Sequence, residues 1–400
     1  MSTSLSLSQS GLDRLHAAMA ARVERKELPG LVTLIAQGDT VRTDTFGTKS
    51  FDTDEPMRRE TLFRIASMTK PVLAVATLML IEDGKLALED RIDRWLPELA
   101  DPRVLQRIDG PLDETVAARR PLTVDDLLTF RLGSGLLTEP SFNPDFPIVS
   151  AGKDLQLVLA EPDPPTPHAP DEWIKRFGSL PLMYQPGKRW LYNVGSLILG
   201  VLVARVAGQP LGDFFKTRIF DPLGMRSTGF SLPLARTRDL PAYYATNFET
   251  NQLQLRNVST PEEWSHAPVF PSGASGLAST ADDYLAFARL LLNRGEYQGQ
   301  RLLSARSVEL MTNNHLTPDQ IATGGVILGG RGWGLGVAVV TEPDAGWPVA
   351  GRYGWAGGYG STWFNDPHLG IVAILLTQTS DVMWNGTLGE FDKLVAGCVG

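Results

Sequence analysis

The chain has 400 residues with 43% hydrophobic and 20% charged side chains, a composition typical of a soluble globular protein with a large core. A formal net charge of −8 without a basic stripe excludes a nucleic-acid-binding protein, and a single cysteine, Cys398, excludes an intrachain disulfide. The first residues lack the features of a signal peptide, and the longest apolar run is about half of the ~20 residues that cross a bilayer. We therefore expect a cytoplasmic protein with no membrane partner.

The first part of the chain predicts a helix, a hairpin and a second helix. Residues 12–26 have apolar side chains at helical spacing, and residues 31–35 and 41–46 read as two strands joined at Gly38-Asp39. Residues 67–83 are apolar on every side, which predicts a helix buried in the protein. Gly84 stands where a C-cap is expected.

The middle of the chain predicts helices and a long proline-rich stretch. A capping residue, Thr123, starts one helix, and residues 196–206 form an apolar helix that ends at Gly208. Residues 139–186 are dense in proline, and loops of this length in compact enzymes are usually lids or binding walls. Residues 281–292 predict a further helix.

The C-terminal part predicts strands, which lie at residues 334–340, 357–363 and 371–377. Strands at both ends of the chain with helices between them indicate an α+β fold of the α/β sandwich type, with one antiparallel sheet built from N- and C-terminal segments and flanked by helices. We expect residues 1–85 and 265–400 to form this α/β domain, and residues 86–264 to form a mostly helical insert that carries the proline-rich wall of an active site.

Ser67 and Lys70 begin the buried helix and share one of its faces, because they are one turn apart. A lysine held there can take the serine proton, or tune another base, if its own pKa is lowered. The N-terminus of the helix also favours a developing oxyanion. The alternative is a serine cap beside a surface lysine. The same spacing recurs at Ser150 and Lys153, in a proline- and glycine-rich stretch where we expect no helix to orient the pair.

Tyr192 follows a Pro-Gly turn and directly precedes an apolar helix, so its phenol could project from a rigid corner. To act as a base at neutral pH, its pKa must fall from about 10, and we expect an adjacent ammonium to lower it. The alternative is a packed aromatic side chain.

The segment of residues 354–360 is rich in glycine, which lets a backbone approach a ligand closely. An N–H at the strand edge could be the second donor to an oxyanion. The alternative is a glycine-rich turn.

These three elements, in this order, resemble the serine β-lactamase and penicillin-binding-protein superfamily. The closest resemblance is to its esterase branch, the family VIII carboxylesterases related to class C β-lactamases. Residues 122–136, 221–225 and 276–283 are also similar to segments of that family, and the resemblance runs from about residue 12 to residue 377. It implies the β-lactamase-like fold.

The resemblance also implies roles for individual residues. Ser67 would be the acylated nucleophile, and Lys70 and Tyr192 would together remove its proton and pass it to the leaving group. Because two such groups titrate together, the first base stays unassigned. The backbone N–H groups of Ser67 and Gly358 would form the oxyanion hole. Trp355, Ala356 and Gly357 would bind substrate, with Trp355 lining the acyl pocket.

Two departures from the family pattern favour esters. Val194 stands where β-lactamases and peptidases usually have an amide-holding Asn, and Trp355-Ala356-Gly357 replaces their Lys-Thr-Gly or His-Ser-Gly. Both changes remove groups that recognise amides and carboxylates. We therefore expect a serine carboxylesterase whose partner is a small-molecule ester. Acyl transfer, and β-lactam or amide hydrolysis, remain alternatives, as does a non-catalytic ligand-binding member.

Other signals are weaker. The chain has no Gly-x-Ser-x-Gly elbow, and its five histidines lack metal-ligand spacing. Residues 324–336 do not form the dinucleotide-binding fingerprint. We expect no metal and no organic cofactor, and the sequence leaves the oligomeric state open.

Overall fold

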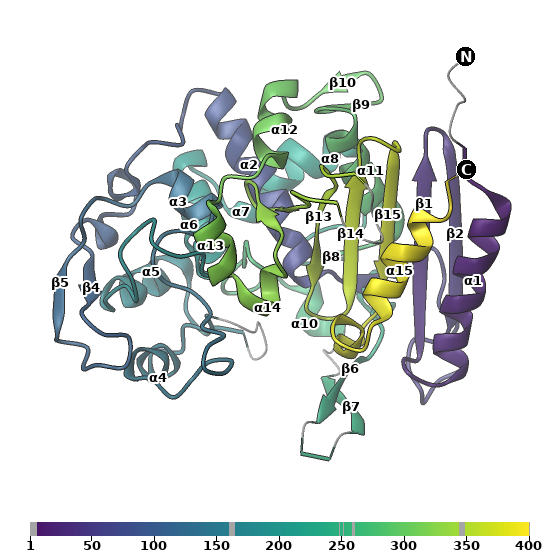
Figure 1. The fold of residues 1–400 in the computed structure, drawn as a ribbon, viewed down its shortest axis with the longest axis horizontal. Coiled ribbons are helices and arrows are strands. Elements are labelled where there is room, and N and C mark those ends of the chain that lie inside the picture. Colours follow the sequence, from purple (N-terminus) through teal and green to yellow (C-terminus); the bar gives the residue numbers. More distant parts are fainter. Residues whose placement is uncertain are drawn as a thin grey trace.

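The computed structural model describes residues 6–159, 165–247, 249–250, 252–257, 261–343 and 349–399. Its centre is a seven-stranded antiparallel sheet in the order β11-β12-β13-β14-β15-β1-β2 (Figure 1). The strands are β1 (Gly30–Gln37), β2 (Thr40–Gly47), β11 (Gly332–Trp333), β12 (Ala338–Val339), β13 (Tyr353–Gly357), β14 (Ser361–Asp366) and β15 (Ile371–Leu376). Because β1 pairs with β15, the two ends of the chain build one sheet, as predicted.

The N-terminal hairpin confirms the sequence prediction. β1 pairs with β2 from Gly30 opposite Gly47 to Gln37 opposite Thr40, and Gly38 in the turn has a left-handed φ of 54°. β1 is buried along nearly its whole length, whereas exposure alternates along β2, which is the edge strand. The hydrophobic pattern therefore places one strand inside the sheet and the other at its edge.

The C-terminal strands depart from the prediction. The expected single strand at residues 357–363 is wrong, because β13 ends at Gly357, a turn follows, and β14 begins at Ser361 opposite Gly357. Gly360 in the turn has a φ of 99°. Of the strand predicted at residues 334–340, only the two residues of β12 form a strand. Sequence reasoning missed β13 because two glycines interrupt its five residues, and glycine weakens a strand pattern.

Helices cover both faces of the sheet. On one face, α1 (Gln9–Glu24) and α15 (Thr387–Ala396) share a hydrophobic cluster with the sheet that includes Met19, Ile35 and Phe391 (Figure 1). On the other face, α2 (Thr69–Glu82) and α11 (Ala281–Leu292) belong to the main core. The helix predicted at residues 281–292 is confirmed at both ends.

The helix predicted at residues 67–83 is confirmed with a short 3₁₀ turn, Ala66–Met68, before α2. Every side chain from Thr69 to Leu80 is buried. The helix ends at Glu82 with Asp83 as its C-cap, and Gly84 follows with a φ of 70°. A helix surrounded by protein is a rigid base for the residues at its start.

The region between the two sheet-forming segments is rich in helices. Thr123 caps α3 (Val124–Leu128) through a reciprocal pair of hydrogen bonds with Asp126, and α6 (Val194–Ala207) ends at Gly208 in a left-handed conformation, both as predicted. The proline-rich stretch contains α4 (Pro147–Asp154) and α5 (Pro170–Gly178), and its residues 160–164 lie outside the described residues. The proposed domain boundaries stay a prediction.

The remaining elements are short. They are the paired strands β3 (Phe63–Arg64) and β8 (Ala278–Ser279), β4 (Arg103–Leu105) and β5 (Thr115–Ala117), β6 (Tyr243–Asn247) and β7 (Gln252–Asn257), and β9 (Glu296–Tyr297) and β10 (Gln300–Arg301), and the helices α7 (Leu211–Phe215), α8 (Asp221–Leu223), α9 (Leu234–Thr237), α10 (Pro261–Ser265), α12 (Ala305–Thr312), α13 (Pro318–Thr323) and α14 (Gly325–Leu328).

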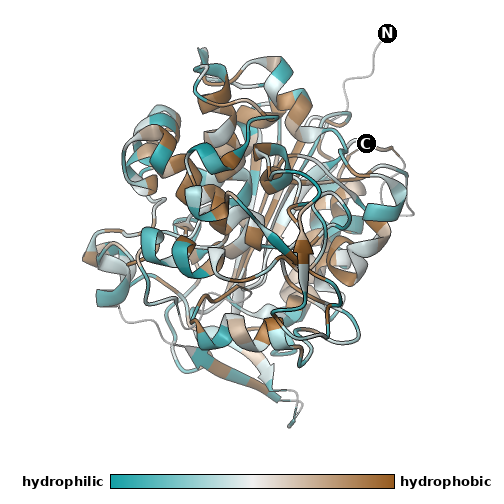
Figure 2. Cartoon of the chain, turned by 90° about the vertical axis from the view of Figure 1, so that its left-hand side faces the viewer, coloured by the Kyte–Doolittle hydropathy of each residue, from teal (hydrophilic) through white to brown (hydrophobic). Residues whose placement is uncertain are grey.

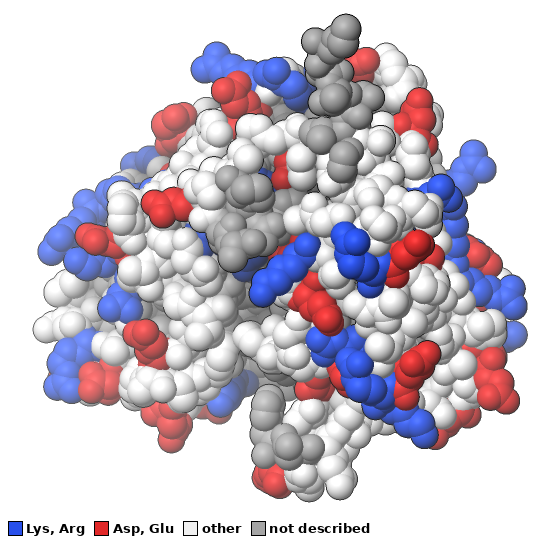
Figure 3. Space-filling view, turned by 45° about the vertical axis from the view of Figure 1, so that its right-hand side comes forward, with Lys and Arg blue, Asp and Glu red and all other residues white. Residues whose placement is uncertain are grey.

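Hydrophobic residues gather in the interior of the protein and charged residues on its surface. Figure 2 shows hydrophobic stretches on the central strands and hydrophilic stretches on outer helices. On the face drawn in Figure 3, Lys and Arg side chains alternate with Asp and Glu. Among the described residues, no single helix could span a membrane by length and composition, and α6 with Leu211–Leu223 could do so only as a pair bent by 77°.

Candidate active site

Ser67 lies at a sharp junction between a strand and a helix. β3 pairs with β8, the Ile65 N–H donates to the Leu277 carbonyl, and the chain then turns into the 3₁₀ segment before α2. Ala66, directly before the serine, has a left-handed φ of 42°. An L-residue other than glycine pays about 1–3 kcal/mol for such a conformation. The surrounding structure therefore holds Ser67 in a strained, well-defined turn.

Lys70 projects from the first turn of α2 and meets Ser67 as the spacing predicts. Its side chain is only 1% exposed, and its Nζ donates to Ser67 Oγ at 2.9 Å and to the Ala274 carbonyl at 2.8 Å. Its contacts among the described residues include no carboxylate. Burial without an anionic partner lowers the pKa of Lys70 well below its ordinary value. This environment favours the neutral amine.

Ala274 belongs to a run of small residues that fits between helices. A Cβ on Gly273 would lie 2.7 Å from the Leu73 side chain of α2 and 3.0 Å from the Ser196 carbonyl of α6. This close fit brings the Ala274 carbonyl to Lys70. Sequence reasoning missed the contact, and the run of glycine and serine at residues 272–276 was the available signal.

Tyr192, which lies just before α6, contacts both Ser67 and Lys70. Its carbonyl accepts from the Leu136 N–H, and its side chain is hydrogen-bonded to that of Ser67. Lys70 Nζ lies 4.4 Å from the centroid of its ring. Burial raises the pKa of Tyr192, which contradicts our expectation that an ammonium would lower it. The expectation was wrong because burial disfavours both the phenolate and the ammonium.

Trp355 on β13 also contacts Tyr192. Its indole Nε1–H donates to the Tyr192 hydroxyl at 2.8 Å, and its ring packs edge-on against Trp333 with a centroid separation of 4.8 Å. The Arg331 guanidinium lies 5.5 Å from the same ring and donates to the Leu328 carbonyl. Only 6% of Trp355 is exposed. Its expected place in the acyl pocket stays a prediction, and the contact with Tyr192 was not foreseen.

Gly357 brings the end of β13 against the turn that carries Ser67. A Cβ at Gly357 would lie 2.3 Å from the Ile65 carbonyl, so only glycine permits this approach. Gly358 follows in the exposed turn, where a Cβ would have no neighbour within 4 Å. Ala356 is partly exposed. The predicted oxyanion donors thus come from two segments that touch beside the serine.

The second Ser-x-x-Lys copy has a different environment from the first. Our expectation that no helix lies there is wrong, because α4 carries both Ser150 and Lys153. Lys153 is exposed, however, and Ser150 Oγ contacts Asp145 at 3.5 Å. The copy therefore lacks the burial that lowers the pKa of Lys70.

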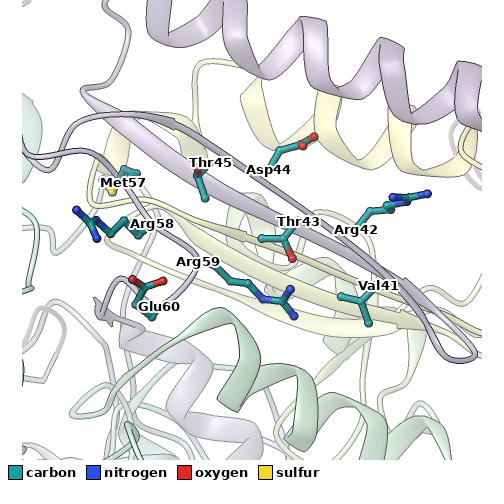
Figure 4. A pocket seen from close by; sticks show the side chains of 9 residues that line it. All are labelled: Val41, Arg42, Thr43, Asp44, Thr45, Met57, Arg58, Arg59 and Glu60. Atoms are coloured by element: carbon teal, nitrogen blue, oxygen red, sulfur yellow. The ribbon is translucent and has the colours of Figure 1, made fainter.

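Within the described ranges, neither a pocket nor a metal-binding cluster involves these candidate residues. A hollow of about 690 Å³ lies between the edge strand β2 and residues 57–60, and none of the candidate site residues lines it (Figure 4). No group of three or more His, Cys, Asp or Glu side chains in the described ranges could hold a metal ion.

A serine beside a buried lysine at a helix start, next to a tyrosine and the last residues of a sheet strand, forms a candidate site of the kind expected for a serine enzyme with a β-lactamase-like fold. The chain belongs to the Beta-lactamase family, whose model matches residues 15–390. The predicted superfamily and fold class are confirmed. The fold matches the solved structure of EstCE1, a hydrolase with promiscuous acyltransferase activity, at 25% identity, with a TM-score of 0.77 and 98% of each chain covered.

The chain is similar to named proteins over nearly its whole length. It is 32% identical to Esterase EstB of Burkholderia gladioli, over 94% of this chain and 92% of that protein. It is 37% identical to Protein Rv1367c of Mycobacterium tuberculosis, over 92% of this chain and 90% of that protein. It is 29% identical to Lovastatin esterase of Penicillium rubens, over 92% of this chain and 94% of that protein.

Proposed function

We propose that this protein is a serine carboxylesterase that cleaves small acyl esters through an acyl-enzyme on Ser67. The observation that carries the proposal is the 2.9 Å contact between Ser67 Oγ and the Nζ of a fully buried Lys70. Burial lowers the pKa of that lysine, which favours the neutral amine that can act as a base. The names of EstB and Lovastatin esterase support an ester substrate.

In the acylation step, Lys70 takes the proton of Ser67 as Oγ attacks the ester carbonyl carbon. The carbonyl π electrons move to oxygen, and the backbone N–H groups of Ser67 and Gly358 donate to the resulting oxyanion. Each such donor is typically worth about 3 kcal/mol in the transition state. The contact of Gly357 with Ile65 supports this role, because it holds the two donor segments together.

The tetrahedral intermediate then expels the alcohol. The bond from carbon to the leaving oxygen breaks, and the Lys70–Tyr192 pair returns the serine proton to that oxygen. Burial raises the pKa of Tyr192, so its hydroxyl rests protonated and suits a proton donor better than a first base. Water attacks the acyl-enzyme in the second half-reaction, with the same pair handling its protons.

The environment of Trp355 supports an ester over a β-lactam or peptide. The position that carries a cation in Lys-Thr-Gly holds an indole here, and that indole is bound to Tyr192. It offers no charge to a substrate carboxylate. Val194, fully buried at the start of α6, offers no amide hydrogen bond.

Acyl transfer is the second candidate reaction. EstCE1 is described as a hydrolase with promiscuous acyltransferase activity, and a relative from Penicillium citrinum that is 25% identical is named a carboxylate methylbutanoyltransferase. An alcohol can attack the same acyl-enzyme in place of water. Adding a primary alcohol to an ester assay and measuring the new ester separates transfer from hydrolysis.

A fluorophosphonate probe tests the nucleophile. We expect the adduct on Ser67 by peptide mass spectrometry, and none in Ser67→Ala. Ser150→Ala is the matched control, because it removes the other Ser-x-x-Lys serine, and it should label like the parent protein. A non-catalytic binding protein would not be labelled. Ser67→Ala and Lys70→Ala should each lose nearly all ester turnover.

The substrate class is tested by comparing kcat/KM for a short-chain p-nitrophenyl ester and a chromogenic cephalosporin. We expect a clear preference for the ester. A preference for the cephalosporin would contradict the esterase assignment while leaving the Ser67 nucleophile intact.

We propose membership of the family VIII carboxylesterases, a small-molecule ester as the partner, and a cytoplasmic location. The location rests on the sequence, and cell fractionation with an antibody to the native protein tests it.

A further inference from the structure

The hydrogen bond between Trp355 and Tyr192 has a fixed direction. An indole Nε1–H can only donate, so the Tyr192 oxygen is the acceptor of this 2.8 Å bond. The hydroxyl proton of Tyr192 is therefore not used in this bond and can be donated to another oxygen. The side chain hydrogen-bonded to Tyr192 on the other side is Ser67. A chain of hydrogen bonds thus runs from the Trp355 indole through the Tyr192 hydroxyl to the Ser67 side chain.

The protein holds Trp355 rigidly in this orientation. Only 6% of Trp355 is exposed, and its ring packs edge-on against Trp333, at an interplanar angle of 85°. Trp333 is itself fixed, because its indole N–H donates to the Leu128 carbonyl at 3.1 Å. Trp355 lies on β13, two residues before the glycine that contacts Ile65. The donor to Tyr192 and the Ser67 turn are therefore parts of one packed unit.

The contacts of Lys70 leave the hydroxyl proton of Tyr192 available for donation to a substrate oxygen. Lys70 Nζ donates to Ser67 and to Ala274, and it lies over the Tyr192 ring at 4.4 Å from the centroid. In its neutral form, the amine can accept the serine proton across this same 2.9 Å contact. Tyr192 is placed to give its own proton to an oxygen arriving beside Ser67.

We propose that Trp355 is a positioning residue that directs the Tyr192 hydroxyl toward the leaving oxygen of the ester, so that Tyr192 protonates the departing alcohol. The inference rests on the proposed function and deepens it. In this step the bond between the carbonyl carbon and the leaving oxygen breaks, and the Tyr192 proton moves to that oxygen. The Lys70 ammonium, formed when it took the serine proton, restores the proton of Tyr192. The Trp355 N–H stabilises the negative charge that develops on the tyrosine oxygen.

The choice of leaving group tests this role. An alkoxide needs a proton to depart, whereas p-nitrophenolate departs without one. We compare kcat/KM for ethyl butyrate and p-nitrophenyl butyrate, which share one acyl group. Trp355→Phe removes the N–H and keeps an aromatic ring. It should lower kcat/KM for the ethyl ester at least ten times more than for the p-nitrophenyl ester.

Further variants separate a positioning role of Trp355 from a packing role. Trp333→Phe is the matched control, because it also removes a buried indole hydrogen bond from the same cluster, and it should affect both esters equally. Trp355→His keeps a ring N–H and should recover part of the ethyl-ester activity lost in Trp355→Phe. In a Tyr192→Phe background, Trp355→Phe should have no further effect on leaving-group preference, because both act through one proton.

The outcomes distinguish this inference from the proposed function. Equal losses on both esters in Trp355→Phe, with Ser67 still labelled by the fluorophosphonate, would overturn the positioning role alone. Full ethyl-ester turnover in Tyr192→Phe would overturn the role of Tyr192 itself. If Trp355→Phe does not fold, the ester comparison in Tyr192→Phe and Trp355→His decides, and an unchanged leaving-group preference in Tyr192→Phe overturns the inference.

Discussion

Gly357 lies so close to Ile65 that a single added carbon would collide with the Ile65 carbonyl at 2.3 Å and with Ser361 Oγ at 2.4 Å. These atoms are backbone or buried, so they cannot move aside cheaply. The contact joins the end of β13 to the strained turn before Ser67. The relative position of the two proposed oxyanion donors therefore depends on the absence of a side chain at Gly357.

Gly357→Ala should therefore misplace the oxyanion donors. A displacement of about 1 Å in an active site can lower the rate on the order of 100-fold, and we expect a loss of that size in kcat for ester hydrolysis. Gly389→Ala is the matched control, because its Cβ would have no neighbour within 4 Å on α15, and it should keep parent activity. Parent-like turnover in Gly357→Ala would show that the contact does not set the site.

The pH dependence of turnover should report the lowered pKa of Lys70. Only the neutral amine accepts the serine proton, so kcat/KM should rise about tenfold per pH unit below the pKa of Lys70 and level off above it. Because burial lowers that pKa, the plateau should begin well below the ordinary lysine value of about 10.4. Initial rates from pH 5 to 9, corrected with Ser67→Ala, measure the profile. A rate still climbing tenfold per unit at pH 9 would contradict a lowered pKa.

The same buried lysine should cost stability at neutral pH. The unfolded chain binds a proton on Lys70 up to about pH 10.4, whereas the folded protein releases it at a lower pH, so folding gains stability as pH rises between the two pKa values. Lys70→Met should accordingly be more stable than the parent protein at pH 6. The gap should narrow as pH rises toward 9.

Urea unfolding of both proteins across that pH range measures the gap. Lys153→Met is the matched control, because it makes the same substitution at a lysine that is exposed on α4. A gap between Lys70→Met and the parent that widens with pH would reverse the sign and refute the argument.

Local sequence patterns predicted the parts of the site that lie close together in the chain. Ser67 and Lys70 are one helical turn apart, and the alternation around Gly38-Asp39 was enough to predict the first hairpin. The same reasoning failed at α4, where a first-turn proline at Pro147 starts a helix that the surrounding prolines obscured.

Contacts between distant segments could not be predicted in this way. Trp355 and Tyr192 are 163 residues apart, and no local pattern relates them. The direction of the Tyr192 pKa shift also depends on burial by the whole fold, which the adjacent lysine alone did not indicate. The catalytic roles of these residues stay predictions until the variants above are measured.

The strained turn before Ser67 gives the last prediction. Ala66 has a φ of 42°, which glycine adopts without penalty and which a β-branched residue tolerates poorly. Ala66→Gly should retain the fold and ester turnover within about threefold, since relief of strain worth about 1–2 kcal/mol offsets the loss of one buried methyl group worth about 0.8 kcal/mol. Ala66→Val should lower both the free energy of unfolding and the fraction of protein labelled at Ser67. Thermal unfolding and fluorophosphonate titration measure the two effects, and a valine variant as stable and as fully labelled as the glycine variant would show that the turn is not strained.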